Sequence, residues 1–142
     1  YLSRPEFVEA EADQRAVHWA KHLDAPIYIV HMADKEGLEA CIRAKEEGAP
    51  VYVETCPQYL EFTCDVYKRE DGRNFVCSPP MKGQESLDAL WEAIKDGFID
   101  TIATDHCPFQ SYEKTGAKMI LQRFREDFRE FRHVEHYFIH MG

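Results

Sequence analysis

The chain has 142 residues, of which 44% are hydrophobic, 13% aromatic and 30% charged, a globular composition long enough for one ordinary domain. Its formal net charge of −9, with no basic patch, argues against a nucleic-acid partner or an anionic membrane surface. No apolar run reaches the roughly 20 residues that cross a bilayer, and the first residues show no signal-peptide pattern. The five cysteines form no Cys-x-x-Cys pair, which indicates reduced thiols. We therefore expect a cytoplasmic protein with no membrane or nucleic-acid partner.

The first predicted element is a helix with Ser3 as its N-cap and Pro5 in its first turn, ended by Pro26. Its apolar stripe at helical spacing consists of Val8, Ala12, Ala16, Trp19 and Leu23. The β-branched and aromatic run 27–30 then predicts a strand that is buried on both faces and ends in His31. A second helix is predicted over 35–47, stopping at Gly48, and a second strand over 51–55.

A looser segment follows, and its short apolar run 75–77 reads as a further strand before Ser78. A helix is predicted over 85–95, closed by Gly97, and a last strand runs from residue 99 towards Asp105. The inward side chains expected in that helix are Leu87, Leu90, Trp91 and Ile94. Strands alternating with helices predict an α/β fold with a parallel sheet.

Polar residues follow each predicted strand, where a βα barrel has its catalytic face. They are His31, Glu54-Thr55, Ser78 and Asp105-His106. Alone, His31 could be an ordinary core or loop residue and Asp105 an ordinary helix cap. Together, an imidazole and a carboxylate suit a divalent metal such as zinc. We expect these two residues to lie at the ends of neighbouring parallel strands and to face one common pocket.

Five ordered groups of residues carry a family resemblance. They are Ser3-Arg4-Pro5 with Glu9-Ala10-Glu11-Ala12, Ile29-Val30-His31, residues 54–60, Ser78-Pro79-Pro80 and residues 103–109. Over about residues 1–117 they resemble the hydantoinase/dihydropyrimidinase branch of the amidohydrolase superfamily. Gln58 and the Cys107-Pro108-Phe109 sequence favour this branch over allantoinases and dihydroorotases, which tend to differ at both places.

The resemblance implies a partial (β/α)8 barrel of the TIM type, comprising about its last three to four βα units. It also implies an active site with two zinc ions, for which His31 and Asp105 are metal ligands. Asp105 is further implied as the catalytic proton carrier, and Ser78 as a substrate-binding residue through its backbone. The expected substrate is a small cyclic ureide or imide, and the expected assembly of the intact protein is a homotetramer or homodimer.

The remaining family ligands belong upstream of Tyr1 in family order, so we expect an incomplete fragment that is inactive alone. Two alternatives stay open, namely an allantoinase- or dihydroorotase-like enzyme and a non-catalytic scaffold like the collapsin-response mediators. The presence of both His31 and Asp105 favours an enzyme. We expect residues 1–117 to be the C-terminal part of the catalytic barrel and 118–142 an atypical tail. The resemblance stops after residue 117, and codons for 118–131 can be read in another frame as family sequence, which predicts a frameshift.

Overall fold

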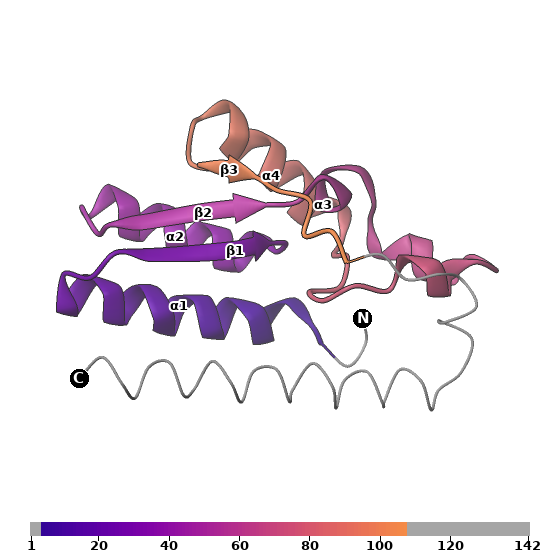
Figure 1. The fold of residues 1–142 in the computed structure, drawn as a ribbon, viewed down its shortest axis with the longest axis horizontal. Coiled ribbons are helices and arrows are strands. Elements are labelled where there is room, and N and C mark those ends of the chain that lie inside the picture. The colour runs from indigo at the N-terminus through magenta and orange to yellow at the C-terminus, as the bar shows by residue number, and fades with distance from the viewer. Residues whose placement is uncertain (1–3, 108–142) are drawn as a thin grey trace. The chain divides into compact units, whose positions relative to one another are not determined.

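A computed structural model describes residues 4–107 as an α/β unit (Figure 1). In chain order the elements are α1 (Glu6–Leu23), β1 (Ile27–Met32), α2 (Lys35–Glu46), β2 (Val51–Thr55), α3 (Pro57–Glu61), the 3-10 helices η1 (Cys64–Lys68) and η2 (Gly72–Phe75), α4 (Gln84–Lys95) and β3 (Thr101–Ile102). The expected frameshift and the tail 118–142 lie outside the described residues. Within residues 4–107, no helix is long and apolar enough to span a membrane.

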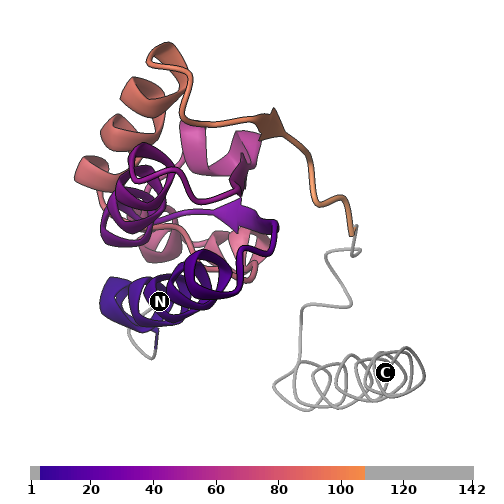
Figure 2. The ribbon, with the colours of Figure 1, turned by 90° about the vertical axis from the view of Figure 1, so that its left-hand side faces the viewer.

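The three strands form one parallel sheet in the order β1-β2-β3. Ile27 lies opposite Val51 in the first pair, and Glu54 lies opposite Thr101 in the second. Helices α1, α2 and α4 gather on one side of the sheet (Figure 2). This arrangement confirms the predicted α/β class and the parallel strand direction, because each parallel connection needs a crossover helix.

The core lies between this helix layer and the sheet. Its largest fully buried apolar side chains include Leu38 from α2, Val53 from β2 and Leu90 from α4. Fully burying an aliphatic side chain of this size stabilises a fold by roughly 1.5–3 kcal/mol relative to leaving it in water. The core therefore joins elements from the beginning, middle and end of the described segment.

Local sequence signals fix α2 and β2 well. Asp34 caps α2 by accepting a hydrogen bond from the Gly37 amide at 2.7 Å, which satisfies one of the amides that a helix start leaves free. After α2 the chain turns at Gly48, whose φ of +86° suits glycine. The predicted helix over 35–47 and strand over 51–55 are therefore confirmed, the helix to within one residue.

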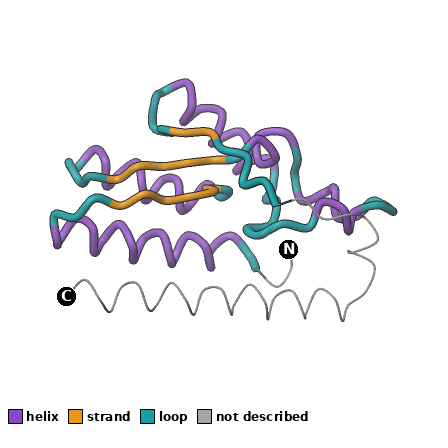
Figure 3. The backbone as a smooth tube through the Cα atoms, in the orientation of Figure 1, coloured by secondary structure: helices purple, strands orange, loops and turns teal. Residues whose placement is uncertain are grey.

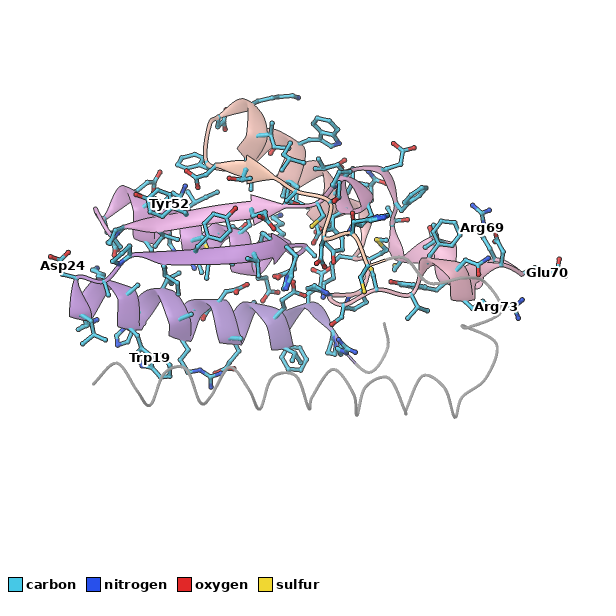
Figure 4. The ribbon with its side chains drawn as sticks, viewed as in Figure 1. Trp19, Asp24, Tyr52, Arg69, Glu70 and Arg73 are labelled. Carbon is cyan, nitrogen blue, oxygen red and sulfur yellow. The ribbon has the colours of Figure 1, made fainter. Side chains whose placement is uncertain are left out.

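The prediction for α1 is wrong in its start and in its buried face. The helix begins at Glu6 with Pro5 as its N-cap, in place of Ser3. The apolar stripe points largely to solvent, with Trp19 59% and Leu23 75% exposed (Figure 4). The buried residues are instead Ala10, Val17 and Ala20. The small side chains on that face let α1 pack closely on α2. Close packing therefore decides which face of α1 is buried, although the larger apolar side chains lie elsewhere on the helix.

The sheet is also open on one face, contrary to the prediction of strands buried on both faces. Three exposed side chains lie on this face, namely Tyr28 and Val30 of β1 and Tyr52 of β2. Inward residues such as Val53 face the helices. Because α1, α2 and α4 all lie on that side, the alternate side chains of each strand meet water. We call these three side chains the open sheet face.

Two further predictions fail after β2. The run 75–77 is not a strand, since Phe75 ends η2 and Val76 is 54% exposed. In α4 the side chain of Trp91 is 44% exposed, and its indole Nε1 donates a hydrogen bond to the Leu60 carbonyl at 3.0 Å. A tryptophan at a helix edge satisfies its polar N–H in this way while covering apolar surface with its ring.

Candidate functional site

The three strands run side by side, and their carboxyl ends lie at the same edge of the sheet (Figure 3). Buried Thr55 connects these ends. The Thr55 hydroxyl donates to the Met32 carbonyl at the end of β1, at 2.7 Å. The Thr55 carbonyl accepts from the Ala103 amide just after β3, at 3.0 Å. One residue of the central strand therefore sets the positions of both outer strand ends.

His31 lies one residue before the end of β1 and is half-buried. Its backbone is left-handed, with φ +45°, and the pairing of β1 with β2 shifts register between Ile29 and Met32. A non-glycine residue in this conformation carries about 1 kcal/mol or more of strain. Such strain and such bulges re-aim side chains and gather at functional sites. The left-handed backbone and the register shift thus occur at the residue that the sequence pattern predicts to be a metal ligand.

Asp105 follows β3 by three residues and is exposed, again with a left-handed backbone at φ +46°. Its negative charge reaches the end of β2, where burial raises the pKa of the Cys56 thiol to about 11 and the Asp105 and Glu54 carboxylates add to the rise. Within residues 4–107 the non-glycine residues with positive φ are Asp24, His31 and Asp105. Two of these three are the predicted ligands.

The prediction that His31 and Asp105 lie at the ends of neighbouring strands is wrong. His31 belongs to β1 and Asp105 follows β3, while β2 lies between them. The strand order follows the chain order, and the short β3 pairs with β2 and not with β1. The two residues share the carboxyl edge of the sheet on alternate strands, and the common pocket stays a prediction.

Ser78 lies on an exposed loop after η2. Its hydroxyl accepts a hydrogen bond from the Arg4 guanidinium at 2.6 Å. The next carbonyl, of Pro79, accepts from the Tyr59 hydroxyl at 2.8 Å and from the Cys77 thiol at 3.0 Å. Arg4, just before α1, and Tyr59 in α3 thus both contact the loop that carries the predicted substrate contact.

Sequence reasoning missed a buried charge cluster behind this edge. Lys82 pairs with Glu9 at 2.6 Å, and their side chains are only 4% and 18% exposed. Asp34 is fully buried, and burial raises its pKa to about 6 although the Gly37 amide opposes the rise. Two signals could have found the pair: Glu9 belongs to a quoted family motif, and Lys82 follows the Ser78-Pro79-Pro80 motif by two residues.

The donor chemistry at the edge suits a divalent cation in part. An imidazole and a carboxylate are typical ligands of zinc, and His31 and Asp105 supply one of each. Within the part of the chain that the structure describes, however, no group of three or more His, Cys, Asp or Glu side chains could hold a metal ion. The assignment of His31 and Asp105 as metal ligands therefore stays a prediction.

Known proteins resemble this chain closely over most of its length. D-phenylhydantoinase of Escherichia coli O1:K1 / APEC is 45% identical over 114 residues, which is 80% of this chain and 25% of the relative. The dihydropyrimidinase from Brevibacillus agri NCHU1002 matches with a TM-score of 0.75 and 38% identity, over 77% of this chain and 24% of that one. The D-hydantoinase (dihydropyrimidinase) from Thermus sp. matches with a TM-score of 0.75 and 35% identity, over 78% and 25%.

No family model matches the chain. The pairwise matches are consistent with one another, because sequence and structure comparisons both return hydantoinases and dihydropyrimidinases. In each case the chain spans about a quarter of the length of its relative. By sequence and by structure, the chain is therefore similar to hydantoinases and dihydropyrimidinases.

Proposed function

We propose that this segment supplies part of the active site of a metal-dependent hydrolase that opens cyclic amides such as hydantoins or dihydropyrimidines. One observation carries the proposal. The two residues that match the family's metal ligands, His31 and Asp105, lie at one sheet edge and both have left-handed backbones. The rest of a (β/α)8 barrel would complete the fold beyond this three-stranded sheet.

Each residue has a stated role in this proposal. The His31 imidazole and the Asp105 carboxylate would hold divalent metal, with zinc as the proposed ion. Asp105 would also take a proton from the attacking water and return it to the leaving amide nitrogen. Ser78 would orient the cyclic substrate through its backbone, since its hydroxyl is bonded to Arg4. Bound metal would supply Lewis-acid polarisation of the scissile carbonyl and a more acidic water.

The same reasoning extends to partners. The substrate is a small cyclic ureide or imide, and the intact protein is proposed to be a cytoplasmic homotetramer or homodimer with two metal ions in each active site. In this proposal, residues 4–107 contribute two of the side chains that bind these metal ions, His31 and Asp105. We therefore propose that the 142-residue chain does not turn over substrate alone.

A graft tests the function. Residues 1–107 replace the matching segment of the Escherichia coli D-phenylhydantoinase, and ring opening of hydantoins and dihydrouracil is followed by chromatography. The graft should be active, and Asp105→Asn should lower kcat at least 100-fold, because an amide cannot carry the proton. Asp24→Asn is the matched control: Asp24 has the same left-handed backbone, φ +48°, at the opposite end of the sheet (Figure 4).

A second variant separates metal binding from folding. His31→Gly removes the imidazole but suits a φ of +45°, so the graft should fold and should lose bound metal, measured by elemental analysis. An Asp105→Asn graft that keeps more than a tenth of its activity contradicts the proposed proton carrier. A His31→Gly graft with full metal content contradicts the proposed ligand.

A further inference from the structure

The loop formed by residues 77–83 is tied to the start of α1, more than 70 residues earlier in the chain. Arg4 donates to the Ser78 hydroxyl at 2.6 Å, and the Gly83 amide donates to Glu6 at 3.3 Å. Between these two contacts, the Lys82 ammonium pairs with Glu9 at 2.6 Å. We call residues 77–83 the serine loop. Three separate contacts hold it against the first turns of α1.

Glu9 reaches a second element from the same position. Its carboxylate accepts a hydrogen bond from the backbone of Ala33, which directly follows β1 and is two residues beyond His31. Burial raises the pKa of Glu9, while the Lys82 ammonium opposes that rise. One buried carboxylate thus joins the serine loop to the strand end that carries the proposed metal ligand.

Burial makes this connection sensitive to the loss of either partner. The Lys82 side chain is 4% exposed, and the Asp13 and Asp34 carboxylates also act on it electrostatically. A buried ammonium is tolerated only where opposite charge compensates for lost water, and removal of one partner leaves an uncompensated charge. The Glu9–Lys82 pair therefore differs from an exposed surface ion pair, and it is suited to holding the serine loop in one position relative to α1.

The opposite side of the serine loop is anchored by uncharged hydrogen bonds. The Lys82 carbonyl accepts from the Cys64 amide at 2.7 Å, and the Met81 amide donates to the Tyr67 hydroxyl at 2.8 Å. These bonds fix the loop to η1. The contacts with α1 relate it to the end of β1, through Glu9.

We propose that Glu9 and Lys82 are positioning residues, whose buried ion pair sets the distance between the Ser78 backbone and the His31 strand end. The proposal rests on the proposed function, because it assigns substrate to Ser78 and metal to His31. Neither Glu9 nor Lys82 touches the reacting atoms in this scheme. They act by holding two parts of one site in register, and small displacements of such parts cost large factors in rate.

Hydrogen exchange on the 142-residue chain tests the connection without any activity. Lys82→Met should speed exchange of the Gly83 and Met81 amides at least 10-fold. The Val53 amide, which donates to Asp100 at 2.7 Å, should be unchanged. Lys82→Arg keeps the charge and should preserve slow exchange. If Lys82→Met prevents folding, the double variant Glu9→Gln with Lys82→Met removes both charges and should fold with fast Gly83 exchange.

Kinetics in the graft test the positioning role. Lys82→Met should raise KM at least 10-fold, Lys82→Arg should restore it to within 3-fold, and Leu90→Ala should destabilise the graft without changing KM. Unchanged Gly83 exchange in Lys82→Met, or an unchanged KM, overturns the proposal. An inactive unsubstituted graft overturns the proposed function instead, and the exchange measurement on the chain then decides the connection.

Discussion

Replacing Asp13 with asparagine should stabilise the folded chain at neutral and alkaline pH. Asp13 lies on α1, where its carboxylate fills the space that a Cβ on Gly37 would occupy at the start of α2. Burial raises its pKa from 3.8 to about 7, and the negative charges of Asp34 and Glu9 add to the rise. Asparagine keeps the shape but removes the charge that this environment disfavours.

The sign follows from proton linkage. With a folded-state pKa above the unfolded one, the folded chain binds more protons between about pH 4 and pH 7, so its stability falls as pH rises through that window. A rise of about three pKa units corresponds to ~4 kcal/mol at about 1.4 kcal/mol per unit. Because Asp13 keeps partial access to water, we halve this value. Asp13→Asn should therefore gain about 2 kcal/mol at pH 8 and almost nothing below pH 4.

Urea unfolding between pH 4 and pH 8, followed by far-ultraviolet circular dichroism, measures the effect. Fluorescence is less suitable, because Trp19 and Trp91 are both largely exposed in the fold. The exposed Asp24→Asn is the control and should change stability by less than about 0.5 kcal/mol. An Asp13→Asn variant that is neutral or less stable at pH 8 would refute the reasoning.

Three further outcomes are expected. Leu90→Ala, at a fully buried site, should cost about 2–5 kcal/mol in urea unfolding, and a loss below 1 kcal/mol would mean that α4 is loosely packed. Thr55→Val should cost about 1–3 kcal/mol because the Met32 carbonyl loses its buried donor, whereas Thr55→Ser should cost less, and equal losses would assign the effect to packing. The 142-residue chain with added zinc should not open hydantoin or dihydrouracil in a chromatographic assay, and measurable turnover would contradict the proposed need for further ligands.

Sequence patterns predicted best those features that depend on nearby residues. The extent of α2 follows from its Asp34 cap and the glycine at residue 48, and β2 follows from its β-branched run. The burial of whole faces depends on what packs against them. Trp19 and Tyr28 are apolar in sequence but exposed. In the described segment, α1 meets α2 through alanines, and no helix within residues 4–107 covers the second sheet face.

Some features of the candidate site could also be predicted from nearby residues, and others could not. His31, Asp105 and Ser78 follow from motifs, since each stands at a fixed place after a predicted strand. The left-handed backbones at His31 and Asp105 were not foreseen, because nothing in either residue type requires them. The Glu9–Lys82 pair joins residues 73 positions apart, and such pairing depends on the sheet order. The expectation of neighbouring strands was wrong because β2 lies between β1 and β3.

The open sheet face has a practical consequence for characterising the chain. Tyr28, Val30 and Tyr52 give a row of ring and aliphatic surface that is about half accessible to water. Environment-sensitive dyes that fluoresce on apolar surfaces should therefore bind the fully folded chain. Such binding is usually taken as a sign of a molten globule. For this chain, dye fluorescence would coexist with sharp, cooperative unfolding and well-dispersed side-chain NMR signals, and substitution of Tyr52 by lysine should reduce it.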